Sequence, residues 1–307
     1  MKNKRIAVLM GGMSTERPIS FKSGKAVLGA LRARGYDAVG IDVGPDLPEK
    51  LRAEAIDVAW VALHGQFGED GCVQGLLEIM RIPYTGSGVR PSAAAMDKVT
   101  TKRLLADSGI ALPADTVWRR GEAIPEEVEL PLVAKFPEGG STLGLHIVHE
   151  RAALREALED LSQMGKEVLL EQYIEGDEIT VAVLDGEALP VVGIVPTSGF
   201  FDFEAKYTQG TTSYEVPATT VDADIQERAR EHAALAYRTL GLEGIARADF
   251  IVDGDGTPWF LEINTIPGMT ATSLSPMAAS CVAVSFEDLV ERLLLSARLH
   301  VQVHQQA

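Results

Sequence analysis

Two apolar runs joined by an acidic turn constrain this chain more than any other stretch of its sequence. The first run ends at Val252, residues 253–256 read Asp-Gly-Asp-Gly, and the second run covers residues 258–263. Apolar runs on either side of an Asp-Gly turn are typical of a β-hairpin. Apolar side chains such as Phe250 and Leu261 within the runs indicate that this hairpin belongs to a buried sheet.

The predicted hairpin carries polar side chains on one face. Asp249 lies in its first strand, Arg247 precedes it by two positions, and Glu262 and Asn264 lie two apart at the end of the second strand. Side chains two apart in a strand share a face. Their hard oxygen atoms suit Mg²⁺, which usually accompanies phosphate. The alternative is a solvated acidic hairpin, but unpaired carboxylates among apolar neighbours would be costly to bury.

Composition excludes several classes of protein. The chain has 307 residues, enough for one large or two to three small domains, and 28 basic against 44 acidic residues give a net charge of −16. An acidic chain is a poor candidate for binding nucleic acid. Only Cys72 and Cys281 occur, which favours a reducing cytoplasm over a disulfide-stabilised exterior. No apolar run is long enough to predict a membrane span.

The first third alternates between strand and helix, which predicts a parallel sheet. Predicted strands cover residues 5–10, 36–41 and 58–63, and predicted helices cover residues 19–34 and 47–53. A glycine-rich loop carrying Glu16 follows the first strand. Glu16 is either a ligand contact or a carboxylate at a helix start. The loop lacks the GxGxxG spacing of a dinucleotide-binding protein, so a dehydrogenase is not supported.

Polar residues also follow the third predicted strand. His64 opens a glycine-rich loop at its carboxyl end, where α/β sheets bind ligands, although a structural role is equally open. Glu69, in the same loop, is predicted to cap the next helix. Further on, residues 91–108 are predicted to form one helix, in which Lys98 is either a solvated cation or a ligand contact.

A second lysine lies inside an apolar strand. Lys135 belongs to the run at residues 132–136, and a lysine buried in a strand needs an anion. The glycine-rich turn that follows, with the hydroxyl of Ser141, could close over phosphate. Later runs at residues 168–174, 178–184 and 187–195 predict an antiparallel sheet, and residues 200–217 are long enough for a lid.

With these pieces in order, the chain resembles the D-alanine–D-alanine ligases of the ATP-grasp superfamily. The matching motifs lie at residues 11–20, 64–78, 96–98, 140–144, 202–207, 247–249 and 262–274. Each motif is weak alone, but together they cover nearly the whole chain in the family's order. Two positions depart from the pattern: Phe136 stands where the family usually has proline, and Pro18 where a polar residue is common.

The resemblance implies a fold and a reaction. The fold is α/β, with an N-terminal parallel-sheet domain (residues 1–96) followed by two ATP-grasp domains (residues 97–180 and 181–307). ATP would phosphorylate one D-alanine, and the amine of a second would attack the acyl phosphate to give a cell-wall precursor dipeptide. Two Mg²⁺ ions, replaceable by Mn²⁺, would assist. A cytoplasmic homodimer is also implied.

The resemblance also implies roles for residues of this sequence. Implied metal ligands are Asp249, Glu262 and Asn264. Implied ATP contacts are Lys98, Lys135, Ser141, Glu171, Glu178, Phe200 and Lys206. Implied catalytic groups are Glu16, Ser141, Tyr207, Arg247 and the amide of Gly268. Implied D-alanine contacts are Glu16, His64, Arg247, Gly268, Ser273 and Leu274.

Two other activities fit the same fold. A D-alanine–D-lactate ligase would make an ester, but the pair Lys206 and Tyr207 favours the enzyme that makes the dipeptide. A catalytically silent nucleotide-binding protein would not need its metal and oxyanion residues, and Arg247, Asp249 and Glu262 are all present. The sequence therefore predicts a dipeptide ligase.

Overall fold

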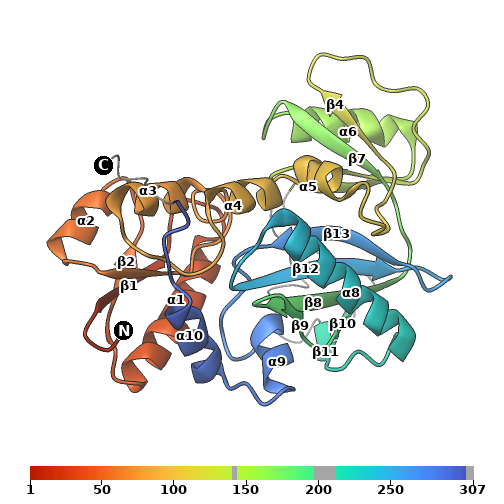
Figure 1. Cartoon of the computed structure of the whole chain (residues 1–307). Helices are drawn as coiled ribbons and strands as arrows, with labels where there is room; N and C mark the ends of the chain where they lie inside the picture. The colour runs from red at the N-terminus through yellow and green to blue at the C-terminus, as the bar shows by residue number, and fades with distance from the viewer. Residues whose placement is uncertain (140–143, 197–211, 302–307) are drawn as a thin grey trace, which may run out of the picture.

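The strands of this protein gather into separate sheets (Figure 1). A computed structural model describes residues 1–139, 144–196 and 212–301 of the chain. Within these ranges there are three sheets, of three, four and six strands. The α/β class predicted from the sequence is confirmed. No helix in the described ranges is long and apolar enough to cross a membrane.

The N-terminal sheet is parallel, as its alternating sequence predicts. Its order is β2–β1–β3, formed by β1 (Arg5–Met10), β2 (Asp37–Asp42) and β3 (Val58–Val61). Helices α1 (Arg17–Ala33) and α2 (Leu47–Ala53) connect these strands. After Arg5 the central strand β1 is continuously apolar, as expected for a strand buried on both faces. The loops that leave β1 and β3 at their carboxyl ends face the site described below.

The helical link after this sheet differs from the prediction of one helix over residues 91–108. After α3 (Cys72–Met80), the chain forms α4 (Val89–Met96) and α5 (Lys98–Leu105), separated at Asp97. Asp97 has extended backbone angles, φ −90° and ψ 108°, and its side chain accepts hydrogen bonds from the amides of Val99 and Thr100 in the first turn of α5. A capping carboxylate therefore ends one helix and starts the next.

The four-stranded sheet is antiparallel and has its own hydrophobic core. Its order is β4–β7–β5–β6. The bounds are β4 (Asp115–Arg119), β5 (Leu132–Lys135), β6 (Leu145–Val148) and β7 (Glu167–Gln172). Helix α6 (Arg151–Leu161) packs Leu154, Leu158 and Leu161 against the sheet, beside the buried ring of Trp118.

The six-stranded sheet contains the hairpin predicted from the sequence. Its main path is β11–β10–β8–β12–β13, with β9 paired to β8. The strands are β8 (Asp177–Leu184), β9 (Glu187–Ala188), β10 (Val192–Pro196), β11 (Thr212–Glu215), β12 (Ile245–Val252) and β13 (Pro258–Asn264). Helix α8 (Ala223–Leu240) covers the face on which Phe250 and Phe260 are buried.

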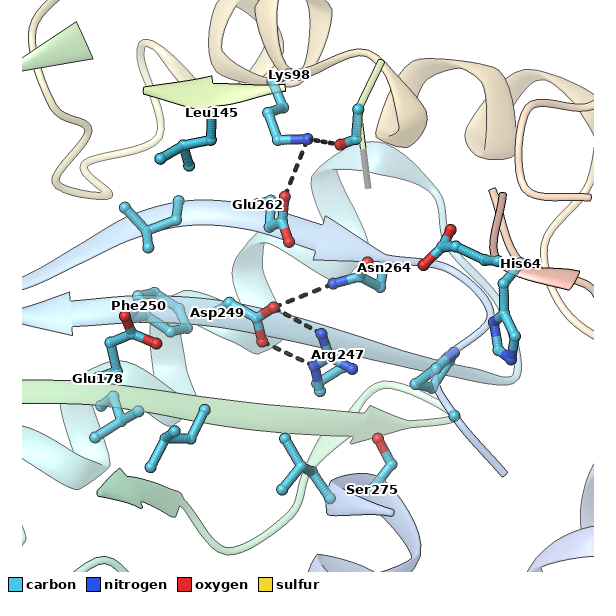
Figure 2. A pocket seen from close by; sticks show the side chains of 18 of the residues that line it. His64, Lys98, Leu145, Glu178, Arg247, Asp249, Phe250, Glu262, Asn264 and Ser275 are labelled. Carbon is cyan, nitrogen blue, oxygen red and sulfur yellow. Dashed lines mark hydrogen bonds and ion pairs between the residues drawn. The ribbon is translucent and has the colours of Figure 1, made fainter. Parts of the chain in front are cut away.

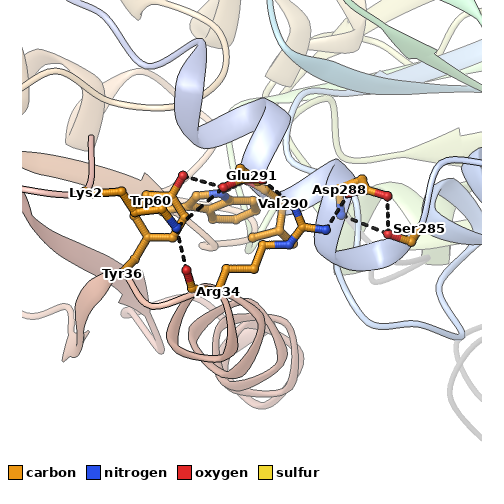
Figure 3. A network of polar contacts seen from close by, with 8 residues as sticks. All are labelled: Lys2, Arg34, Tyr36, Trp60, Ser285, Asp288, Val290 and Glu291. Carbon is orange, nitrogen blue, oxygen red and sulfur yellow. Dashed lines mark hydrogen bonds and ion pairs between the residues drawn. The ribbon is translucent and has the colours of Figure 1, made fainter.

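The last two helices bring the chain back to the N-terminal sheet. They are α9 (Leu274–Ser280) and α10 (Phe286–Leu295), and α10 packs beside α1. Figure 3 shows Arg34 of the N-terminal part paired with Asp288 and Glu291 of α10. The hydroxyl of Tyr36 donates to Glu291 at 2.5 Å. One hydrophobic core continues beneath these contacts from the N-terminal sheet into the six-stranded sheet.

The predicted domain boundaries at residues 96/97 and 180/181 stay predictions. The four-stranded sheet ends at Gln172 and the six-stranded sheet begins at Asp177, so the change of sheet lies a few residues before the second predicted boundary.

Candidate active site

A pocket of about 890 Å³ lies where the three sheets meet. The N-terminal sheet supplies residues such as His64, the four-stranded sheet supplies Lys135, and the six-stranded sheet supplies the polar face of the hairpin. In Figure 2, Lys98 reaches over Glu262, while His64 lies at the other end of the pocket. The motifs that fall within the described residues therefore contribute to one cavity.

The hairpin places its acidic residues opposite each other. Asp249 of β12 pairs in register with Glu262 of β13, and Arg247 pairs with Asn264. A register shift between Asp249 and Phe250 marks a β-bulge beside this pair. The side chains of Asp249 and Glu262 are about one-fifth exposed, so both carboxylates are half-buried at the pocket wall. The solvated-hairpin alternative is therefore wrong.

Asp249 is held by several donors. Arg247 donates from Nε at 2.8 Å and from Nη2 at 2.7 Å, and Asn264 donates from Nδ2 at 3.2 Å. The hydroxyl of Thr180 donates at 2.6 Å. This paired arrangement fixes the carboxylate and guanidinium planes relative to each other.

Lys98 is a buried cation of the site and not a solvated one. It begins α5, so its ammonium points from the helix start toward the hairpin. Its Nζ lies 3.0 Å from Glu262 Oε2 and donates to the carbonyl of Gly139 at 2.6 Å. The break at Asp97 thus helps to orient Lys98.

A second lysine that sequence reasoning missed completes a buried charge cluster. Lys102 is 1% exposed and donates to Glu171 Oε1 at 2.6 Å and to the carbonyl of Pro113 at 2.7 Å. Lys135 pairs with the other oxygen of Glu171. Burial disfavours the ionised form of Glu171, but the two lysines outweigh it and lower the pKa of that carboxyl. The one sequence signal for Lys102 was its spacing of four residues from Lys98, which places both lysines on the same side of a helix.

The N-terminal side of the pocket is also polar and buried. Glu16 lies at the start of α1 and lines the pocket, and His64 is 7% exposed. Burial lowers the pKa of His64, against the charge of Glu16. The ring Nε2 of His64 lies 3.1 Å from the hydroxyl of Ser23, another residue that sequence reasoning missed.

The prediction that Glu69 caps a helix is wrong. Its carboxyl accepts from the backbone amides of Gly65 at 2.8 Å and Ile266 at 3.0 Å, while Gly71 in a left-handed conformation starts α3. Burial and the nearby charge of Glu16 raise the pKa of Glu69 to about 8. Its partner Ile266 is far away in sequence, so local patterning could not reveal this role.

The remaining candidate residues divide into two groups. Glu178, Gly268, Ser273 and Leu274 line the pocket. Ser141, Phe200, Lys206 and Tyr207 lie outside the described residues, and the roles predicted for them stay predictions. In the described part of the chain there is no group of three or more His, Cys, Asp or Glu side chains that could hold a metal. The hairpin instead offers two carboxylates and the amide of Asn264.

Comparison with known proteins identifies the family. A family model described as D-ala D-ala ligase C-terminus matches residues 112–295, and one described as D-ala D-ala ligase N-terminus matches residues 45–87. A D-alanine–D-alanine ligase of Syntrophotalea carbinolica is 48% identical over 300 residues, covering 97% of this chain and 98% of the relative. The chain belongs to the D-alanine–D-alanine ligase family.

Solved structures of other members of the D-alanine–D-alanine ligase family share this fold. The Bacillus anthracis ligase complexed with ATP has a TM-score of 0.84 at 34% identity and covers 95% of this chain and 97% of its own. The ligase of Coxiella burnetii has a TM-score of 0.81 at 25% identity, covering 96% and 94%. The resemblance inferred from sequence motifs and the expected ATP-grasp fold are confirmed.

The buried charge cluster predicts a large stability difference between adjacent basic residues. Replacing Lys102 with Met leaves Asp115 and Glu171 with fewer cations, and breaking a buried pair costs about 3–5 kcal/mol of unfolding free energy. The control Arg103→Gln also loses a partner of Asp115, but this arginine is mostly exposed, so the loss should stay below about 1 kcal/mol. Urea denaturation without nucleotide measures the unfolding free energy of both variants. Equal losses would contradict the prediction that the buried cluster contributes more stability than the exposed pair.

The raised pKa of Glu69 predicts a dependence of stability on pH. Between its ordinary value of 4.5 and about 8, the folded protein keeps a proton that the unfolded chain has released. The contribution of Glu69 to unfolding free energy therefore falls as pH rises through this window. Glu69→Gln should gain stability relative to the wild type as pH rises, whereas Glu49→Gln, at an exposed site on α2, should not. Parallel pH profiles for the wild type and Glu69→Gln would show that the prediction is wrong.

Proposed function

We propose that this protein joins two D-alanine molecules into D-alanyl-D-alanine at the expense of ATP, to supply a peptidoglycan precursor. The observation that carries the proposal is the meeting of two half-sites in one pocket. Lysines face the hairpin carboxylates on one side, and Glu16, His64 and Gly268 lie on the other. This arrangement suits phosphoryl transfer beside an amino-acid site.

The reaction needs an activated carboxylate, because a free carboxylate is a poor electrophile. The bond from the terminal phosphoryl group to ADP breaks, and a new bond to a carboxylate oxygen of the first D-alanine gives an acyl phosphate. The amine of the second D-alanine attacks the carbonyl carbon and loses a proton. The resulting tetrahedral intermediate collapses as its bond to phosphate breaks, which releases the dipeptide and inorganic phosphate.

Nucleotide binding falls to the side of the pocket where the lysines lie. Lys98 and Lys135 contact phosphate oxygens of the nucleotide. These oxygens either displace the carboxylates that pair with the two lysines in this structure or bind beside them. Glu171 and Glu178, from β7 and β8, accept hydrogen bonds from the adenine and the ribose. Phe200, Ser141 and Lys206 complete the ATP contacts, as the family resemblance implies.

Asp249, Glu262 and Asn264 would hold two Mg²⁺ ions, which Mn²⁺ can replace. The donor set fits, because hard oxygen atoms lie together at the pocket wall, and the cations Lys98 and Arg247 already bind its carboxylates. Mg²⁺ held by these residues would neutralise charge on the phosphate oxygens. The hairpin itself keeps the carboxylates in register for this task.

The amino-acid side of the pocket supplies orientation and charge. Glu16 binds the ammonium group of the first D-alanine, with His64 beside it. Arg247 and the amide of Gly268 stabilise the oxyanion of the tetrahedral intermediate. Ser273 and Leu274 contact the second D-alanine, and Ser141 and Tyr207 link with Glu16 when the site closes. We expect the enzyme to act as a cytoplasmic homodimer.

The activity test measures phosphate release from ATP and Mg²⁺ with D-alanine, and identifies products by mass. D-Alanine alone should release phosphate and yield the dipeptide, whereas L-alanine should not. Adding D-lactate should leave the dipeptide as the product, and a dominant ester would favour the D-alanine–D-lactate alternative. ATP binding without release in any arm would indicate a silent nucleotide-binding protein.

The metal proposal is tested in the hairpin. Glu262→Gln removes one carboxylate from the donor set and should lower the rate of phosphate release by at least the roughly 10- to 100-fold that loss of a group around a metal site costs. The control Asp255→Asn makes the same charge change in the exposed hairpin turn and should keep near-normal turnover. The Mg²⁺ dependence of the rate should change only in Glu262→Gln. Near-normal turnover of that variant would refute the assignment.

A further inference from the structure

Ser23 joins the two halves of the amino-acid site. It lies on α1, is 1% exposed and borders the pocket. Its hydroxyl oxygen accepts from the backbone amide of Met269 at 3.1 Å and lies 3.1 Å from His64 Nε2. The residue before Met269 is Gly268, so one hydroxyl touches both the imidazole and the loop that carries the proposed oxyanion donor.

The partners of these groups decide the direction of each hydrogen bond. A backbone amide can only donate, so the hydroxyl of Ser23 accepts from Met269. The backbone of Ile266 favours the protonated ring of His64, as an accepting carbonyl does, and Nδ1 is the ring nitrogen left to donate to it. In the neutral ring, Nε2 then carries no proton and accepts the hydrogen of the Ser23 hydroxyl. The neutral ring is thereby held as the tautomer protonated at Nδ1.

The same loop is held at a second point. Ile266 donates its amide to Glu69 at 3.0 Å and accepts from His64 at its carbonyl. Three side chains of the N-terminal part therefore hold the backbone on both sides of Gly268. All three are more than nine-tenths buried, so water does not compete for these bonds.

We propose that Ser23 is a positioning residue of the ligase reaction, which fixes the backbone at Gly268 and the tautomer of His64 through one hydroxyl group. This inference rests on the proposed function. Without the hydroxyl, the amide of Met269 and Nε2 of His64 both lose their partner in a buried site. The loop can then shift, and the amide of Gly268 moves away from the oxyanion that it stabilises. A misplacement of about 1 Å is enough to slow an enzyme by about 100-fold.

A neighbouring serine offers a matched control. Ser20 lies one helical turn earlier on α1, is 0% exposed and donates to the carbonyl of Ala62 at 2.6 Å. Ser20 is as buried as Ser23, but its hydroxyl hydrogen-bonds to Ala62, whereas that of Ser23 hydrogen-bonds to His64 and Met269. Replacing each serine with alanine therefore separates the loss of a buried hydroxyl from the loss of this particular connection.

The kinetic test compares Ser23→Ala with Ser20→Ala at saturating ATP and D-alanine. Ser23→Ala should lower kcat by about 10- to 100-fold, because the oxyanion donor is displaced, while the KM for ATP stays within about twofold. Ser20→Ala should keep kcat within about twofold despite a similar loss of thermal stability. Equal kcat values for the two variants would overturn the proposal.

A spectroscopic test does not depend on activity. Nitrogen-15 spectra of the six histidines, with His64 assigned from the signal missing in His64→Gln, report the tautomer of each ring. The wild-type signal of His64 should show a proton on Nδ1, and Ser23→Ala should lose that pattern. A wild-type ring protonated at Nε2 would overturn the proposal. Wild-type protein that releases no phosphate would instead overturn the proposed function, and the spectra would still decide the hydrogen-bond connection.

Discussion

The pairing of Asp249 with Glu262 across one hairpin is the constraint on which the site depends. Two carboxylates that face each other in a half-buried sheet repel unless cations or donors surround them. The fold brings those partners from different elements: Arg247 from the same strand and Lys98 from the start of α5. The helix break at Asp97 and the convergence of the sheets place these cations close enough to the two carboxylates to offset their charge.

The balance extends to the nucleotide side of the pocket. The whole chain is strongly acidic, yet Glu171 lies between the ammonium groups of Lys102 and Lys135. Because both lysines are almost fully buried, their charges act over short distances with little screening. The pocket can therefore attract a polyanion although the protein as a whole would repel one.

Sequence reasoning reached the features that are local along the chain. The hairpin and the parallel N-terminal sheet follow from apolar periodicity and turn residues, and the order of motifs identified the family. The single antiparallel sheet predicted from residues 168–195 is wrong, because β7 belongs to the four-stranded sheet while β8, β9 and β10 belong to the six-stranded sheet. Sequence reasoning did not reach Ser23, Lys102 or the true partners of Glu69. Each of these acts through a residue distant in sequence, such as Met269, Glu171 or Ile266, and only packing brings such pairs together.

The shared core beneath α1 and α10 has a consequence for how the molecule can come apart. The N-terminal and six-stranded sheets share one cluster of buried residues besides a cluster of their own, whereas the four-stranded sheet has only its own cluster, between residues 118 and 170. The first two sheets therefore form a single cooperative unit, and the four-stranded sheet is a separate one. We therefore expect the four-stranded sheet to loosen without unfolding the two sheets that carry the hairpin, Glu16 and His64.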